Sequence, residues 1–541
     1  MSDAYTWQPG GMKKFSLPDI PESEQTPVVK GLLTLVELLI EENTALKERV
    51  EKLEDEVRVL KGQKKRPTFK PSALDKNTQT DDEKENTKKS HSGKKRGSAN
   101  VTRPVDRNER IRPDNIPPGS TLHDIRPFHV QELIISSEHI CYELERWKTP
   151  DGRIITARPP VSGHFGHQLI TYVLYQHHHC QVTQPLLLEQ LREWGVQISS
   201  GQLNRILLDD KDAFHEEKEA LLDAALMHSD YITVDDSGAR HQGKNGYVTH
   251  IGNAWFGWFC STLSKNRINF LMLLNAGDVQ YRISAQAIAY MRQNKLPQVL
   301  LTQLSLSVAV SFAEQEAWQA YLEALNIKDK RHIRIATEGA LVGHLLHKGQ
   351  MDNLAIISDG AGQFAVFEHG LCWVHTERLI RNLLPLNEAH QREVDTVITQ
   401  VWDFYRQLRQ YKDAPTSEKA NRLSAEFDAI FTQKTNYITL NRKLRQIHQH
   451  KAKLLLVLRH PEVPLHTNGS ETDIRDYVKK RKVSGGTRSD EGRRCRDTFA
   501  SLKKTCRKLE VSFWRYLKDR LTENVLPPLP ELMQNKMVAG Q

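Results

Sequence analysis

Three acidic residues lie where a predicted strand or helix meets solvent. Asp235 ends a β-rich run at 231–234, Asp359 follows the apolar run 355–357, and Glu471 stands in the first turn of a predicted helix. Carboxylates are the ligands that hold Mg²⁺ in proteins. Two such ions, about 4 Å apart, can activate an attacking oxygen and stabilise a leaving oxygen in phosphoryl transfer. The pattern therefore predicts a site for two Mg²⁺ ions, with Mn²⁺ as a substitute.

Each acid also has a plainer interpretation when it is taken alone. Asp235 or Asp236 could form a turn, and Asp359 with Gly360 could form a tight turn. Glu471 could stabilise a helix N-terminus in a capping box. Sequence spacing by itself does not show that three distant acids meet.

The residues after Glu471 favour a phosphate-backbone substrate. Arg475, Val478 and Lys482 continue the helical face of Glu471, and Gly485–Gly486 ends the helix before a second basic run. A carboxylate flanked by this much positive charge suits a nucleic-acid site. The predicted DNA-contacting residues are Arg475, Lys479, Lys480, Arg481, Lys482, Arg488, Arg493 and Arg494.

These segments resemble the transposases of the bacterial insertion sequence 66 family, over about residues 159–521. The motifs are Val234-Asp-Asp-Ser237, Ser358-Asp-Gly360, Cys372-Trp-x-His375 and, most specifically, Asn468-x-Ser-Glu471 with Arg475 and Arg481-Lys482. The resemblance implies a ribonuclease-H-like catalytic domain whose acidic triad maps onto Asp235, Asp359 and Glu471. It also implies that Asp235, rather than Asp236, is the first catalytic acid.

Two features depart from the family pattern. Family members often carry a Cys-rich zinc segment before the helical region, where this chain has only Cys141, so we expect no stoichiometric zinc. The run His177–Cys180 is interpreted as a helix end, because adjacent residues on a helix point in different directions. Residues 279–350 look like an insertion.

Residues 29–61 carry a heptad repeat. Leucines recur at d, from Leu32 to Leu60, and valines fill a, except for Asn43. β-Branched a and leucine d favour a parallel two-stranded coil, and one asparagine at a fixes its register. We therefore expect self-association through these residues into a homodimer. A single amphipathic helix packed on its own domain is the alternative.

The remaining composition places the protein among soluble DNA-binding proteins. Lys and Arg outnumber Asp and Glu by 76 to 67, and the net charge of +9 favours a polyanionic partner. The six cysteines are scattered, which is typical of a reducing compartment. No apolar run is long enough to span a membrane. We expect a cytoplasmic location, at the bacterial nucleoid.

The expected fold class is α/β, with helical insertions, an α-helical DNA-binding region and an N-terminal parallel coiled coil. The predicted units are a tail (1–26), the zipper (27–62), a basic disordered linker (63–120), a helix-turn-helix-like region (121–225), the catalytic domain (226–525, with helical insertions at about 279–350 and 376–462) and a tail (526–541).

The predicted function is that of a DNA transposase. It would bind the terminal inverted repeats of its element and target DNA, with accessory transposition proteins as further candidate partners. A stand-alone ribonuclease-H-fold nuclease or resolvase is the rival of the same chemistry. A domesticated, non-catalytic DNA-binding protein is the rival of another class, but such a role would not require three intact acids.

Overall fold

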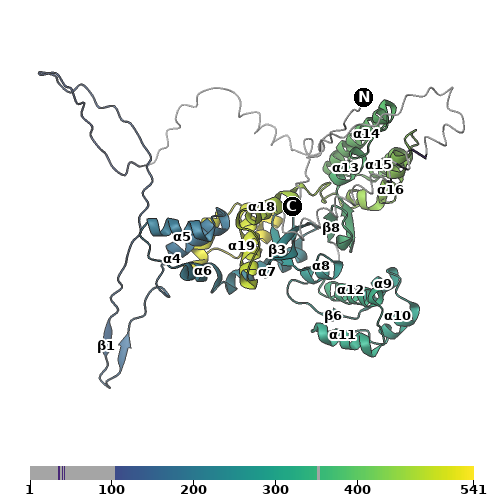
Figure 1. Ribbon diagram of the computed structural model, residues 1–541, viewed down its shortest axis with the longest axis horizontal. Helices are drawn as coiled ribbons and strands as arrows, with labels where there is room; N and C mark the ends of the chain where they lie inside the picture. Colours follow the sequence, from purple (N-terminus) through teal and green to yellow (C-terminus); the bar gives the residue numbers. More distant parts are fainter. Residues whose placement is uncertain (1–34, 37–38, 40–41, 43–103, 350–353, 541) are drawn as a thin grey trace, which may run out of the picture.

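Figure 1 shows the computed structural model of the protein, which describes residues 35–36, 39, 42, 104–349 and 354–540. The predicted zipper lies almost wholly outside these residues. Only Leu35, Val36, Leu39 and Glu42 are described within it, and all four are helical. None of the helices in the described part of the chain combines the length and the apolar character that a membrane crossing demands.

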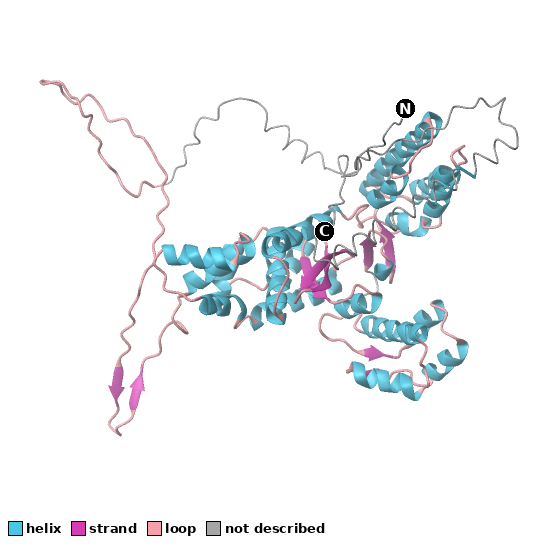
Figure 2. Cartoon of the chain, viewed as in Figure 1, coloured by secondary structure: helices cyan, strands magenta, loops and turns pink. Residues whose placement is uncertain are grey.

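Residues 104–166 form an extended, exposed arm (Figure 2). Its only regular structure is an antiparallel hairpin of β1 (Arg146–Lys148) and β2 (Ile154–Thr156). The prediction of a helical region therefore differs from the structure for residues 121–166. Apolar residues such as Ile134 remain 86% exposed. Short helices are marginal unless an apolar face is buried, which explains why none forms here.

Helices begin at His167. They are α4 (His167–Leu174), the π-helical turn η3 (Tyr175–His179), α5 (Gln184–Glu193), α6 (Ser200–Leu208) and α7 (Asp212–His228). Gly195, at a φ of 81°, follows the end of α5. Ser199 and Gln202 form a reciprocal capping box at the start of α6. The predicted helix-turn-helix shape is confirmed.

A five-stranded mixed sheet lies at the centre, in the order β5-β4-β3-β8-β9. Its strands are β3 (Tyr231–His241), β4 (Lys244–Gly252), β5 (Gly257–Thr262), β8 (Ala355–Ser358) and β9 (Glu368–Leu371). The first three are antiparallel neighbours, whereas β8 runs parallel to β3 and β9 parallel to β8. Continuous burial of β8 is typical of a central parallel strand. The expected α/β class is confirmed.

The first helical insertion lies between β5 and β8. Its elements are α8 (Arg267–Leu274), β6 (Tyr281–Arg282), α9 (Ala285–Gln293), α10 (Gln298–Ser305), β7 (Ser311–Phe312), α11 (Gln315–Ala324) and α12 (Lys330–His347). The apolar run at 270–274, which would also suit a strand, belongs to α8. The Asn266 side chain caps that helix by accepting a hydrogen bond from the Asn269 amide at 2.8 Å.

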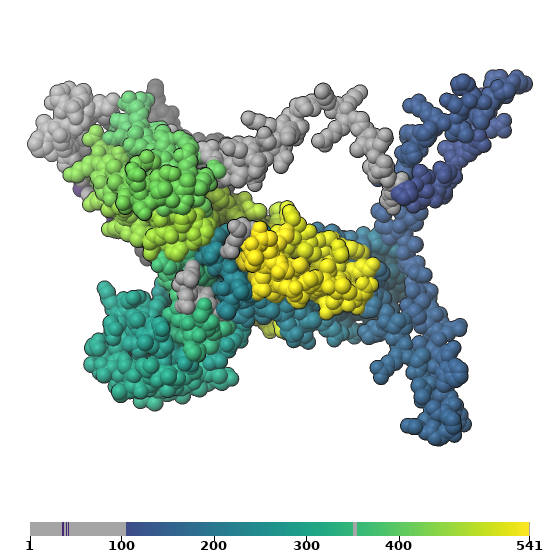
Figure 3. Space-filling model, turned by 180° about the vertical axis from the view of Figure 1, so that it is seen from behind, coloured from purple at the N-terminus to yellow at the C-terminus, as the bar shows by residue number. Residues whose placement is uncertain are grey.

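The second insertion follows β9 and has its own apolar core, which includes Trp373, Phe404 and Phe427. Its helices are α13 (Trp373–Arg381), α14 (Glu388–Asp413), α15 (Ser417–Thr432), α16 (Ile438–His448), α17 (Lys451–Leu454) and the 3-10 turn η5 (Leu456–Leu458). Figure 3 shows the two insertions as separate lobes on one side of the molecule.

The C-terminal helices return to the sheet. They are α18 (Asn468–Ser484), α19 (Asp490–Lys508), α20 (Phe513–Leu521) and α21 (Leu529–Gly540). The α19 helix packs across β5, and α21 packs on α7. Residues 526–540 are therefore not a simple tail as expected, because Leu529 and Met533 are fully buried.

Candidate active site

The sheet register places Asp235 beside Asp359. Parallel pairing of β3 with β8 matches Thr233 to Ile357. Asp235 and Asp359 each lie two residues beyond that pair, so they occupy equivalent positions on neighbouring parallel strands. Side chains alternate with period two and adjacent strands lie about 4.8 Å apart, so both acids emerge on the same face and at the same edge.

Helix α18 brings Glu471 to this edge. The residue before it, Ser470, is 1% exposed and donates a hydrogen bond to the Thr233 hydroxyl at 2.6 Å. Thr233 in turn donates to the Gly252 carbonyl at 2.9 Å. The first turn of α18 is thereby fixed to β3 two residues before Asp235. The structure thus brings Glu471 towards the part of β3 that carries Asp235, which lies inside the strand and not at its end as expected, because pairing with β4 continues to His241.

Helix α13 lies on the other side of Glu471. His375 Nε2 is 3.8 Å and Arg378 Nη1 is 3.9 Å from Glu471 Oε1, while Arg475 Nη2 is 3.2 Å from Oε2. Sequence reasoning identified the Cys372-Trp-x-His375 motif but gave it no role beside Glu471. The spacing of His375 and Arg378, three residues apart on one helix, was the signal that could have suggested a shared target.

A buried thiol, that of Cys372, forms a hydrogen bond with His375. Cys372 is 1% exposed, and its Sγ accepts a hydrogen bond from the Thr467 amide at 3.4 Å. Burial acts to raise the pKa of the Cys372 thiol, but the hydrogen bond and charge of His375 leave it below its ordinary value. Burial acts to lower the pKa of His375, but Cys372 and Glu471 leave it raised. Cys372 and Glu471 therefore favour the protonated form of His375.

Asp235 and Asp236 have different surroundings. Burial, followed by the charge of Asp359, raises the pKa of Asp235 to about 7, and Asp236 and Glu471 contribute to the increase. Asp236 instead lies 3.3 Å from Lys265 Nζ and accepts a hydrogen bond from Gln363 Nε2 at 2.5 Å. The carboxylate of Asp235 is thus surrounded by negative charge, whereas that of Asp236 is already paired.

The chemistry of these side chains fits a hard cation. Magnesium prefers carboxylate oxygens, and the mutual repulsion of the half-buried Asp235 and Glu471 with the exposed Asp359 is relieved when a cation binds. Glu471 Oε1 is buried and accepts no hydrogen bond. Across residues 104–349 and 354–540, however, no three His, Cys, Asp or Glu side chains are grouped as a ready metal site. The acids converge on one edge without being arranged as ligands.

The predicted DNA-contacting residues differ in exposure. Arg475, Lys479, Lys482, Arg488 and Arg494 are exposed, Arg481 and Arg493 are half-buried, and Lys480 is 8% exposed. Lys479 pairs with Asp476 at 3.4 Å and Arg493 with Asp490 at 2.8 Å. The exposed members follow α18 and the start of α19, which extends positive charge away from the acidic edge.

The histidine run packs against protein. His177 Nδ1 lies 2.9 Å from the Val182 carbonyl, and His178 stacks on Phe499 with ring centroids 4.1 Å apart. Burial, followed by the charge of Lys480, lowers the pKa of His177 to about 3, which keeps the ring neutral. The interpretation of this run as a helix end is confirmed by the π-helical turn that ends at His179.

A mixed α/β sheet with acids at one edge and cationic helices beside them defines the class of protein. The family model for the transposase IS66 family matches residues 353–494, a range that includes Asp359 and Glu471 but not Asp235. The chain is also 39% identical to the uncharacterized protein y4jO of Sinorhizobium fredii (strain NBRC 101917 / NGR234). That match spans 320 residues, 58% of this chain and 100% of y4jO. The chain belongs to the insertion sequence 66 family of transposases, which indicates a DNA-modifying enzyme.

Proposed function

We propose that the protein is a DNA transposase that binds the ends of its insertion element and catalyses Mg²⁺-dependent strand cleavage and strand transfer. The observation that carries the proposal is the equivalent placement of Asp235 and Asp359 on neighbouring parallel strands, with Glu471 held at the same edge. The strand order, an antiparallel meander extended by two parallel strands, supports the ribonuclease-H-like core that the family resemblance implies.

Asp235, Asp359 and Glu471 would hold the ions, which when bound supply charge for the attacking and leaving oxygens. The chain's own contribution is positioning. The Ser470–Thr233 hydrogen bond keeps Glu471 beside the part of β3 that carries Asp235. Arg378 and His375 orient the Glu471 carboxylate. The exposed cations of α18 and α19 would fix the DNA backbone across the acidic edge.

The helix-turn-helix formed by α5 and α6 would recognise the terminal inverted repeats. In such motifs the second helix enters the major groove. Asn204 and Arg205 are exposed on α6, whereas Leu203 and Leu207 face the core. A homodimer formed through residues 29–61 would bring two element ends together in the bacterial nucleoid. Target DNA and accessory transposition proteins would be the remaining partners.

The decisive experiment incubates the purified protein with labelled element-end DNA and Mg²⁺ and measures nicking at the element boundary. Asp235→Asn, Asp359→Asn and Glu471→Gln should each lower cleavage by orders of magnitude, because each removes a charged ligand. Binding to end DNA should survive in all three. Asp236→Asn is the matched control and should retain substantial cleavage. If Asp236→Asn is inactive while Asp235→Asn cuts, the assignment of the acids fails.

The two rival functions give different results in the same assay. A non-catalytic DNA-binding protein would bind the ends without nicking them at any Mg²⁺ concentration. A stand-alone nuclease or resolvase would cut DNA but would not join the freed 3′-OH to target DNA. The double variant Arg475→Ala with Lys482→Ala should show the opposite defect to the acid variants, with weaker and less salt-sensitive DNA binding.

A further inference from the structure

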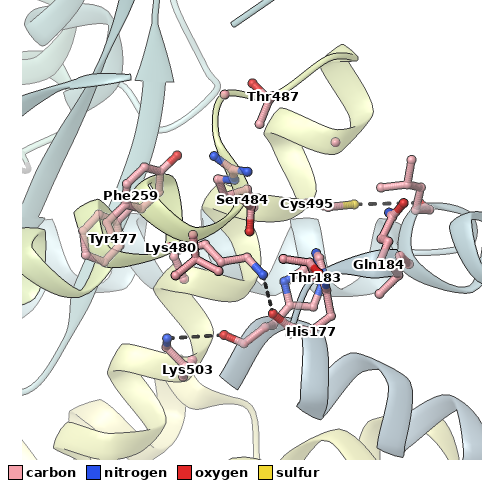
Figure 4. A pocket seen from close by; sticks show the side chains of 18 of the residues that line it. His177, Thr183, Gln184, Phe259, Tyr477, Lys480, Ser484, Thr487, Cys495 and Lys503 are labelled. Atoms are coloured by element: carbon pink, nitrogen blue, oxygen red, sulfur yellow. Dashed lines mark hydrogen bonds between the residues drawn. The ribbon is translucent and has the colours of Figure 1, made fainter. Parts of the chain in front are cut away.

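A cavity of about 500 Å³ lies between the helix-turn-helix and the two basic helices α18 and α19 (Figure 4). We call it the α18–α19 cavity. Its walls come from α5, α6, η3 and the two basic helices, so residues far apart in the sequence meet there. The volume is in the range of pockets that bury small organic ligands, about 300–1,000 Å³. It therefore exceeds what a lone phosphate group requires.

The acids of the cavity are already neutralised. Asp473 is paired with Lys508 at 2.7 Å and with Lys504 at 3.2 Å. Asp476 is paired with Lys504 at 2.5 Å. Both carboxylates are therefore ion-paired with Lys504 or Lys508, and of the other lining cations only Lys503 feels the charge of Asp476, without an ion pair to it.

Three cations in the lining lack a carboxylate. Lys480 donates to the His177 carbonyl at 2.6 Å, Lys503 to the His178 carbonyl at 3.3 Å, and Arg496 to the Gly485 carbonyl at 3.0 Å. In the part of the chain that the structure describes, none of the three has an acid within ion-pair distance. Figure 4 shows Lys480 and Lys503 reaching the histidine backbone from different helices.

These cations destabilise one another. Lys480 is 8% exposed, and burial together with Arg496 and Lys503 lowers the pKa of its ammonium to about 7. Two buried polar atoms of lining residues, Ser484 Oγ and His178 Nε2, also have no hydrogen-bond partner among the described residues. Buried polar atoms are normally paired, so these atoms and the uncompensated charge indicate an anionic ligand with hydrogen-bonding groups.

The opposite wall suits a base. Gln184 and Asn204 present side-chain amides, of the type that pairs with base edges. Leu208 and Val483 add apolar surface. The cavity also lies along α18 from Glu471, at roughly 14–20 Å for a rise of 1.5 Å per residue from Lys480 to Ser484. That span corresponds to about four to six nucleotides of a DNA strand.

We propose that the α18–α19 cavity binds one unpaired nucleotide of the element-end DNA, with its phosphate on Lys480, Arg496 and Lys503 and its base beside Gln184 and Asn204. The inference rests on the proposed function, since it takes end DNA as the ligand. Some enzymes that act on DNA extrude a nucleotide from the stack, which costs unstacking energy, and the uncompensated cations would supply an offsetting contact. The extruded nucleotide would fix the distance from the recognition helices to the scissile bond.

The test uses the full chain and element-end duplexes in EDTA, in which each of the terminal bases is replaced in turn by 2-aminopurine. The fluorescence of this base rises when it leaves the stack. Binding of the wild-type protein should brighten one position, or two adjacent ones, about four to six nucleotides from the boundary. Ser484→Trp fills the cavity but keeps every cation, so it should abolish the brightening. Ser484→Ala is its matched control and should retain it.

Charge variants test the phosphate contact separately. Arg496→Gln and Lys503→Gln should each weaken end-DNA binding about tenfold and lower the slope of log K against log salt by about one. Lys328→Gln removes an exposed lysine of the first insertion and should change neither quantity. Circular dichroism should show native helix content in every variant. If a charge variant unfolds, Ser484→Trp still tests the proposal.

The outcomes separate the two proposals. Wild-type protein that binds and nicks end DNA without brightening any position overturns the cavity proposal and leaves the transposase function intact. Brightening that persists in Ser484→Trp also overturns it. Wild-type protein that neither binds nor nicks end DNA overturns both.

Discussion

Two adjacent carboxylates in β3 have opposite electrostatic surroundings. Asp235 is buried among other acids and its pKa is raised to about 7. Asp236 is paired with Lys265 and Gln363. Because successive side chains of a strand point to opposite faces, one residue of displacement is enough to change the neighbours completely. Asp235, whose raised pKa makes its ionised form costly in the metal-free protein, is thus the acid available to bind a cation.

The raised pKa of Asp235 predicts how stability depends on pH. The folded metal-free protein holds a proton on Asp235 that the unfolded chain releases near pH 4, so this group destabilises the fold progressively as pH rises from about 4 to 7. Asp235→Asn removes the charge and should therefore stabilise the metal-free protein at pH 8 by about 1–3 kcal/mol, and by about a third of that at pH 5. Thermal unfolding in EDTA at the two pH values measures this.

Asp236→Asn is the control for this measurement. It removes an ion pair with Lys265 and should give no stabilisation at pH 8. Addition of Mg²⁺ at pH 8 should raise the unfolding midpoint of the wild type but not that of Asp235→Asn, because bound ligand stabilises only the state that binds it. Equal shifts for the two asparagine variants would contradict the electrostatic difference between the acids.

At the scale of elements, α18 connects the acidic edge with the cationic surface. Its first turn is hydrogen-bonded to β3 through Ser470 and Thr233, and its last turns carry Arg481 and Lys482. Charge along the helix therefore changes from acidic at the sheet to basic near Gly485. A strand of DNA held along α18 would be held in register with Glu471.

Loss of the Ser470 hydroxyl should loosen this connection. Ser470→Ala leaves the Thr233 hydroxyl without its buried hydrogen-bond donor, which should cost about 1–3 kcal/mol of folding stability. Cleavage should fall more than end-DNA binding, because Glu471 shifts while the exposed cations remain. Urea unfolding and the nicking assay measure the two effects. Ser417→Ala, in the exposed first turn of α15, should affect neither.

Local signals predicted the elements that have sharp boundaries. Glu471 lies in the first turn of α18 as expected, and Gly195 and Ser199 are the turn and cap residues that separate α5 from α6. The run at 270–274 was ambiguous because a short apolar segment lacks a distinguishing period. The cap at Asn266 was the signal that indicated a helix. Arm residues 121–166 contain apolar side chains that the described part of the fold leaves exposed, which no local pattern reveals.

The sequence predicted the acids of the candidate site but not the residues that position them. Asp359 follows the end of β8 and Glu471 lies in the first turn of α18, as expected, whereas Asp235 lies inside β3, which continues to His241. The contact of His375 with Glu471 joins α13 to α18 across the whole second insertion. Such a contact depends on tertiary packing, and a single sequence carries no information about which distant helices pack together.

At the scale of the whole molecule, the sheet supports two helical lobes and a helix-turn-helix on separate sides (Figure 1). Insertions at sheet connections leave the strand pairing intact, which is why β3 and β8 remain neighbours although the first insertion separates them. The predicted dimerisation segment, residues 29–61, precedes all of these parts. Two copies joined there would present two acidic edges.

A peptide of residues 27–62 should form a parallel helical dimer. Valine at a with leucine at d favours two strands, and paired Asn43 side chains fix their alignment. Asn43→Leu should raise the thermal stability of the peptide while broadening its distribution of oligomers. Sedimentation equilibrium at tens of micromolar, roughly where helices of this length associate, distinguishes the species. A monomeric wild-type peptide would show that the heptad pattern packs on its own domain instead.

The Asp235–Asp236 doublet makes the two acid-bearing strands unequal in their tolerance of deletions. Deletion of one residue before Asp235 would move Asp236 into the position of Asp235. An aspartate would therefore still lie beside Asp359. The same shift moves Asp235 into the position of Val234, which is 0% exposed, so it buries a carboxylate in the core. No second acid follows Asp359, because the next residue is Gly360, at a φ of 99°. A shortened β3 therefore keeps an acid beside Asp359 but buries another, whereas a shortened β8 keeps none there.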